Sequence, residues 1–167
     1  MSSDYPGTSL SEKEIQDGTV LSVQDKLLGN FAWDTGIAIG KYLAGFKDGV
    51  ILGSYCTQCR KTVVPPRNVC EWCYRPMSEY IPLGDTGVVN TFSLCYVTWD
   101  VKRIKDPEVP AVIDLDGASP LHGIMHKLGD VQPDQVKIGM KVQAVWKPAA
   151  EREGAITDIL YFKPIEE

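Results

Sequence analysis

Long apolar runs are absent from this sequence. None approaches the roughly 20 residues that a membrane-spanning helix needs, and nothing at the N-terminus resembles a secretory signal. Positive charge is also scarce, because 17 Lys and Arg residues stand against 22 Asp and Glu residues, a formal net charge of −5. This balance argues against a broad, charge-driven nucleic-acid interface. We therefore expect a soluble, cytoplasmic protein of one ordinary domain or two small ones.

Catalytic motifs are missing as well. The sequence contains no P-loop, no Gly-x-Ser-x-Gly and no Gly-x-Gly-x-x-Gly. Its two histidines, His122 and His126, stand four residues apart in an expected strand, which would place both on one face, but no carboxylate motif lies nearby to orient them. Cys95 lies in an apolar stretch, a setting typical of a small buried thiol. We therefore predict no catalytic residue in this chain.

The other four cysteines form two Cys-x-x-Cys pairs. Cys56 and Cys59 make the first pair, Cys70 and Cys73 the second, and ten residues separate them. Two short loops with paired thiolates supply the four ligands of a tetrahedral zinc ion. Four protein ligands leave no open position for water, so we predict a structural zinc site. An iron–sulfur centre, a dithiol redox motif and a disulfide framework are the alternatives, the last disfavoured in a reducing compartment.

Glycine is missing from the position after each pair, where a zinc ribbon often has it. Arg60 and Tyr74 stand there instead. If their backbones adopt the left-handed conformation that such turns need, each costs roughly 1–2 kcal/mol.

Helical segments of more than a single turn are expected only in the first 50 residues. Residues 1–9 read as a frayed tail, Ser11 and Glu14 form a capping-box pattern, and residues 20–28 have weak helical spacing. A further helix is expected from Asp34 or Thr35 to Gly49. Its apolar positions are Ile39, Tyr42, Leu43 and Phe46. This helix either packs on its own core, which periodicity favours, or presents Tyr42 and Phe46 to a partner. A short strand is expected at residues 50–55.

The rest of the chain is β-rich and punctuated by Gly, Pro and Asp. Strands are expected at residues 87–99, 111–115, 121–127, 141–146 and 156–162, with a single helical turn at 132–136. Five strands with a small helical element between the third and fourth match an OB barrel, and a small open sandwich is the alternative. The predicted fold is mainly β, with an N-terminal helical extension (1–35), a docking helix plus zinc ribbon (36–80) and an OB-fold domain (81–167).

This order of elements resembles the zinc-ribbon/OB-fold acyl-CoA-associated proteins over residues 36–163. The matching residues are Tyr42, Leu43, Phe46, Gly49 and Ile51 before the four cysteines, the run Pro65-Pro66-Arg67 before the second pair, Gly87 and Val89, Pro110, Leu115 and Gly117, and Ile138-Gly139-Met140 with Val142. Pro65-Pro66-Arg67 is the most specific part. The long N-terminal extension and the missing knuckle glycines depart from the family pattern.

The resemblance implies a rubredoxin-like zinc ribbon and an accessory role beside thiolase-superfamily enzymes. Family members help to hold coenzyme A, bridge enzymes that pass on an acyl-CoA, or pair with a thiolase-like protein in a thiolase or retro-aldolase. One member is the small subunit of a 2-benzoylsuccinyl-CoA thiolase. By resemblance, this chain is expected to act in a hetero-oligomer whose catalytic groups belong to the partner.

Two basic clusters are candidates for contacts with the phosphates of CoA, which favour Arg and Lys. The first is Arg60, Lys61 and Arg67 in the ribbon, and the second is Lys102, Arg103 and Lys105 in the loop expected after the first barrel strand. Trp72 and Trp99 are candidates for stacking on adenine. For each cluster the alternative is an ordinary solvated face. A nucleic-acid-binding module and a purely architectural subunit are the competing functions.

Overall fold

The computed structural model describes residues 11–19, 29 and 31–165, and the chain divides into two units, residues 1–33 and 34–167. In the first unit, helix α1 (Glu12–Gln16) begins with the predicted capping box: Ser11 Oγ accepts from Glu14 N, and the Glu14 carboxylate accepts from Ser11 N. The helical stretch predicted at residues 20–28 lies outside the described residues. Among those described, no helix is long and apolar enough to cross a membrane.

Helix α2 (Gly36–Lys47) opens the second unit and packs on that unit's own core. Asp34 Oδ1 accepts a hydrogen bond from Gly36 N at 2.8 Å, whereas Thr35 makes no side-chain cap. Tyr42 and Phe46 are buried, with ring centroids 4.5 Å apart, and Phe46 meets the edge of Trp146 at 5.6 Å. These two aromatic side chains are therefore core residues and are not presented to a partner.

The C-terminal end of α2 is fixed by Arg152, which comes from the loop between β9 and β10. Gly49 has φ +75°, a conformation that strains other residues, and a Cβ atom at this position would lie 2.3 Å from Arg152 Nη1 and displace that guanidinium. The Arg152 guanidinium also stacks over Trp146 at 5.3 Å, and its Nε donates to Lys147 O at 2.9 Å. One arginine thus joins the helix end to the barrel loop.

A three-stranded antiparallel sheet of order β2-β1-β3 carries the zinc ribbon. Its strands are β1 (Ile51–Cys56), β2 (Lys61–Val63) and β3 (Glu79–Leu83). β1 confirms the strand expected at residues 50–55. β3 was not predicted, because Pro82 interrupts a short run that is half exposed.

The barrel is a five-stranded sheet of order β10-β9-β4-β7-β8. Its strands are β4 (Thr86–Phe92), β7 (Pro110–Leu115), β8 (Gly123–Lys127), β9 (Lys141–Trp146) and β10 (Ile159–Pro164). The two outer strands meet through a parallel bridge between Leu128 and Phe162, with Gly129 N donating to Phe162 O at 2.9 Å. The turn η1 (Pro133–Gln135) lies between β8 and β9, as predicted. This topology confirms the OB-like prediction, and the core inside it includes Val89, Ile113, Val142, Ile159 and Phe162.

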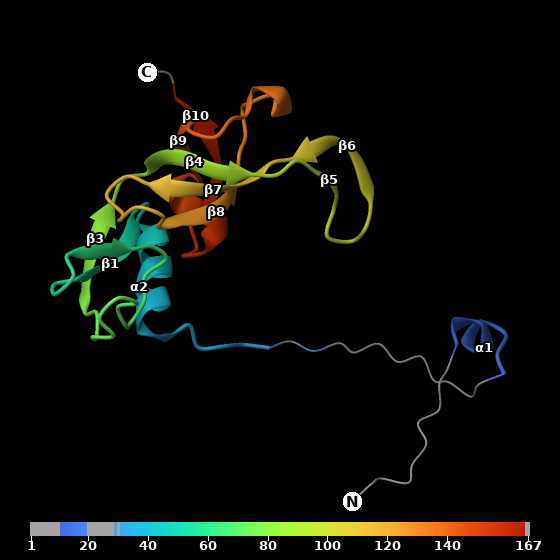
Figure 1. Cartoon of the computed structure of the whole chain (residues 1–167), viewed down its shortest axis with the longest axis horizontal. Helices are drawn as coiled ribbons and strands as arrows, with labels where there is room; N and C mark the ends of the chain where they lie inside the picture. The colour runs from blue at the N-terminus through green and yellow to red at the C-terminus, as the bar shows by residue number, and fades with distance from the viewer. Residues whose placement is uncertain (1–10, 20–28, 30, 166–167) are drawn as a thin grey trace, which may run out of the picture. The chain divides into compact units, whose positions relative to one another are not determined.

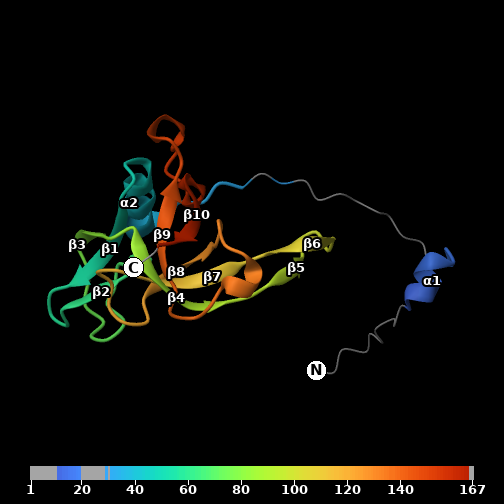
Figure 2. The same ribbon diagram turned by 90° about the horizontal axis from the view of Figure 1, so that it is seen from above.

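The prediction of a single long strand at residues 87–99 is wrong. β4 ends at Phe92, and β5 (Cys95–Val97) pairs instead with β6 (Arg103–Glu108) in a separate two-stranded sheet. The chain leaves the barrel at Ser93, whose N–H donates to Pro110 O at 3.0 Å. We call residues 93–108 the β5–β6 arm. It extends from the barrel on the side away from β1 and β3 (Figures 1 and 2).

Candidate zinc site and the adjoining groove

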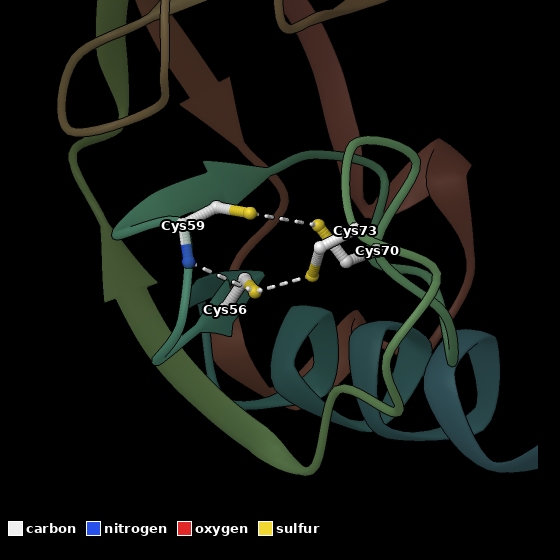
Figure 3. Close-up of side chains that lie close together, drawn as sticks. All are labelled: Cys56, Cys59, Cys70 and Cys73. Carbon is white, nitrogen blue, oxygen red and sulfur yellow. Dashed lines mark hydrogen bonds between the residues drawn. The ribbon is translucent and has the colours of Figure 1, made fainter.

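The four predicted cysteines converge at the end of β1 (Figure 3). All four sulfur atoms lie within 4.8 Å of one another. Cys56 Sγ lies 3.6 Å from Cys73 Sγ, and Cys70 Sγ lies 3.9 Å from Cys59 Sγ. Four sulfurs placed about 2.3 Å from a central zinc ion at tetrahedral angles are about 3.8 Å apart, and the separations of 3.6 and 3.9 Å match that value. The thiols are free, which is the state that metal binding needs.

The two knuckles share one backbone design. Arg60 has φ 55° and Tyr74 has φ 57°, so both residues adopt the left-handed conformation that such knuckle turns need. Arg60 N donates to Cys56 O at 2.7 Å, and Tyr74 N donates to Cys70 O at 2.9 Å. Each tight turn aims its two thiols at the same point, and the local strain is the cost of doing so without glycine.

The crowding of the thiols drives their pKa values apart. Burial disfavours the Cys70 thiolate, but hydrogen bonds from backbone N–H groups of Cys73 and Trp72 outweigh it and lower the pKa of Cys70 to about 7. For Cys59, the hydrogen bond with the Cys73 thiol, followed by burial, raises the pKa to about 12. A divalent cation at the centre removes this conflict because it binds all four groups as thiolates.

A groove of about 570 Å³ lies beside the zinc site, between the ribbon and the barrel. Its ribbon wall consists of Lys61, Val64, Pro65, Arg67, Glu71 and Trp72, and its barrel wall is the β7–β8 loop, residues 119–123. Lys61 Nζ stands 6.0 Å from the centre of the half-exposed Trp72 ring. The groove therefore combines cationic groups with a partly exposed aromatic ring.

Two sets of hydrogen bonds hold the groove walls together. Thr62 N donates to Ser119 Oγ, and Ser119 N donates to Thr62 O, both at 2.9 Å. The buried His122 ring, from the barrel loop, has Nε2 3.0 Å from the Glu71 carboxylate, and its centroid is 5.1 Å from that of Trp72. Glu71 also pairs with Arg67. Ribbon and barrel are joined here by polar contacts that the sequence analysis did not foresee.

The six candidate cations for CoA contact do not form one site. Lys61 and Arg67 line the groove, whereas Arg60 belongs to the first knuckle turn and does not line it. Lys102 and Arg103 lie on the β5–β6 arm, away from the ribbon, and Lys102 is paired with Asp100 at 2.6 Å. The expected loop around Arg103 and Lys105 is strand β6.

The remaining nucleophilic and basic side chains lie apart from one another. His122 precedes β8 and faces Glu71, while His126 lies within β8 against the edge of Phe162, with ring centroids 5.7 Å apart. Burial lowers the pKa of His126. Cys95 is half-buried in β5, more exposed than expected. Among the described residues, Cys95, His122 and His126 share no hydrogen bond or ring contact that would pair a nucleophile with its base.

Comparison with known proteins matches both halves of the second unit to family models. Residues 43–76 match the model of the ChsH2 rubredoxin-like zinc ribbon domain, and residues 80–147 match that of the ChsH2 C-terminal OB-fold domain. A DUF35 domain-containing scaffold protein from Methanocaldococcus jannaschii is 34% identical over 119 residues, 70% of this chain and 82% of that protein. A protein of the same description from Methanothermobacter thermautotrophicus is 26% identical over 117 residues, 68% of this chain and 86% of that protein.

Two solved structures share the fold. The crystal structure of a DUF35 protein of unknown function from Sulfolobus solfataricus aligns with a TM-score of 0.57 at 24% identity, covering 66% of this chain and 79% of that one. A structure described as the Ltp2-ChsH2(DUF35) aldolase aligns with a TM-score of 0.58 at 20% identity, covering 81% and 98%.

Proposed function

Because this chain belongs to the DUF35 family of zinc-ribbon and OB-fold proteins, we propose that it is a non-catalytic, zinc-binding subunit of a thiolase-type complex that makes or breaks carbon–carbon bonds in acyl-CoA substrates. The aldolase whose description names a DUF35 protein together with Ltp2 supports a role beside a partner enzyme. The separation of Cys95, His122 and His126 supports a role without catalytic groups. In this proposal the zinc is structural, because four cysteines leave no open coordination position.

The groove beside the zinc ribbon is where this subunit would help to hold CoA. Lys61 and Arg67 suit the pyrophosphate and 3′-phosphate, and the partly exposed Trp72 ring suits adenine. The groove volume of about 570 Å³ falls within the usual range for small-molecule sites. Hydrogen bonds between its ribbon and barrel walls hold the groove in shape before a ligand binds. The observation that carries the proposal is that one preformed groove holds two cationic side chains beside an aromatic ring. Lys102 and Arg103 have no part in this groove.

CoA binding to the complex, assembled with its thiolase-superfamily subunit, tests this role. K61A and R67A should each weaken CoA binding by about fivefold or more, measured by isothermal titration, because each removes a charged partner of a phosphate. R75A is the matched control, since Arg75 is an exposed ribbon cation outside the groove. If both variants assemble normally and bind CoA as tightly as the wild type, the subunit is purely architectural. Tight, salt-dependent binding of a single-stranded oligonucleotide by the chain would instead favour a nucleic-acid-binding module.

A further inference from the structure

The β5–β6 arm exposes more large apolar side chains than a free surface ordinarily carries. Five of its residues are exposed large hydrophobics: Leu94, Tyr96, Val97, Trp99 and Val101. Trp99 is 96% exposed and Val101 is 83% exposed. Several exposed large apolar side chains on one projecting segment mark an interaction site more often than an ordinary solvent face.

The arm has no layer of the described chain packed over it. β5 and β6 form a sheet of two strands, and no third strand within residues 11–19, 29 and 31–165 pairs with either. A two-stranded hairpin alone is marginally stable in water. Packing against the surface of another molecule would therefore stabilise the arm.

The tip of the arm is ordered even though it projects. Thr98 N donates to Lys102 O at 2.9 Å, and Val101 N donates to Thr98 O at 3.0 Å, closing the loop. Lys102 N donates in turn to Thr98 Oγ1 at 3.1 Å. Val101 has φ 65°, a conformation that costs a β-branched residue free energy. A strained tip that holds Trp99 in the open is organised in advance for binding, which reduces the entropy lost on association.

Charge on the arm changes along β6. Arg103 and Lys105 lie toward the tip, exposed and without an ion-pair partner among the described residues, whereas Lys102 is paired with Asp100. Asp106 and Glu108 lie toward the barrel. The complementary surface is therefore an apolar pocket with carboxylates on its rim.

We propose that the β5–β6 arm is the docking element through which this chain binds its thiolase-superfamily partner subunit, with Trp99 and Val101 entering an apolar pocket bordered by carboxylates. The inference rests on the proposed function and adds to it the surface that assembles the complex. Buried Trp residues at the centre of an interface carry a disproportionate share of the binding free energy. The arm is separate from the ribbon groove, so assembly and CoA contact are assigned to different residues.

The test is the affinity of the purified full chain for the purified thiolase-superfamily subunit, measured by biolayer interferometry. W99S should weaken binding at least tenfold. V101N should also weaken it, because Asn accepts positive φ, keeps the turn and removes only the apolar group. I138S is the matched control: Ile138 is 68% exposed but lies in the loop before β9, and its loss should leave binding unchanged. Equal zinc content and equal thermal midpoints show that the variants are folded.

The outcomes separate the two proposals. If the wild type binds the subunit and both W99S and V101N bind it equally well, the arm inference is overturned while the proposed function stands. If the wild type binds no thiolase-superfamily subunit, the proposed function fails and the inference falls with it. If the wild-type chain alone dimerises in sedimentation and W99S abolishes dimerisation, the occupant is a second copy of the chain. If the arm variants lose binding to a single-stranded oligonucleotide instead, the occupant is a nucleic acid, and either result overturns the inference.

Discussion

His122 Nε2 lies 3.0 Å from Glu71 Oε1, across 51 residues of sequence. Glu71 stands inside the second zinc knuckle, between Cys70 and Cys73, while His122 lies in the β7–β8 loop of the barrel. The other ring nitrogen, Nδ1, lies 3.0 Å from Pro120 O, so both nitrogens have an oxygen partner. This contact joins the zinc knuckle to the barrel, and both residues line the proposed CoA groove.

The contact should be measurable as a coupling between the two residues. We expect H122A and E71A each to lower the free energy of unfolding. The loss in the double variant should be smaller than the sum of the two single losses by about 0.5–3 kcal/mol. The reason is that either change alone removes the same hydrogen bond. Urea denaturation of the zinc-loaded protein provides the three values. Strictly additive effects would show that the contact contributes nothing to stability.

Zinc should be required for the fold of the ribbon. C70S removes a fully buried ligand, and we expect loss of stoichiometric zinc and rapid proteolysis between residues 56 and 76, because for so small a unit most of the folding free energy comes from metal binding. C95S is the control, since Cys95 lies on the arm and should leave the metal content unchanged. Mass spectrometry and limited proteolysis measure both. Stoichiometric zinc and an intact ribbon in C70S would show that Cys70 is not a required ligand.

Glycine should stabilise the knuckle turns. Arg60 and Tyr74 adopt positive φ, so R60G and Y74G should each raise stability by up to about 1 kcal/mol, because relief of strain exceeds the entropy cost of glycine. K61G places glycine in the adjacent strand β2, and we expect it to destabilise the protein. Thermal unfolding of the zinc-loaded variants gives the comparison. Lower midpoints for both R60G and Y74G would mean that their side chains contribute more than the strain costs.

Acid should weaken the β9–β10 loop through Asp158. Burial disfavours its charged form, but its carboxylate accepts hydrogen bonds from three backbone N–H groups, those of Glu153, Gly154 and Ala155. These bonds, helped by Lys147, hold the pKa of Asp158 below its ordinary value. A depressed pKa in the folded state stabilises the protein fully above the unfolded value of about 3.9, and this stabilisation is lost as pH falls through the folded value.

The D158N variant isolates this effect. It should be less stable than the wild type at neutral pH, and the difference should shrink below about pH 4, as measured by denaturant midpoints across the pH range. D134N, which changes an exposed carboxylate in η1, is the control. If the stability difference between D158N and the wild type stays constant down to pH 2, the lower stability of D158N comes from packing and not from the charge.

The features that sequence predicted well are local ones. The Cys-x-x-Cys spacing identified the four cysteines that converge, and the position after each pair marked Arg60 and Tyr74 as the residues at which a left-handed turn would be strained. Helix α2 followed from the spacing of Tyr42 and Phe46. Each of these depends on neighbours within a few residues, where spacing alone determines geometry.

The features that sequence missed depend on contacts between distant segments. Glu71 and His122 carry no local sign that they meet. The β5–β6 arm was predicted as the end of one long strand, because its residues 93–97 continue the β-rich composition of β4, and Pro107 with its charged neighbours concealed β6. The sequence therefore indicates two equivalent basic clusters. Of their six candidate cations, only Lys61 and Arg67 line the ribbon groove.

The most direct test of the central claim compares turnover by this chain, by its thiolase-superfamily subunit and by the two co-expressed, with an acyl-CoA substrate that the isolated native complex cleaves. We predict no turnover by the chain alone and full turnover by a stoichiometric hetero-oligomer that contains zinc. Turnover by the chain alone, or full activity of the partner without it, would contradict the account.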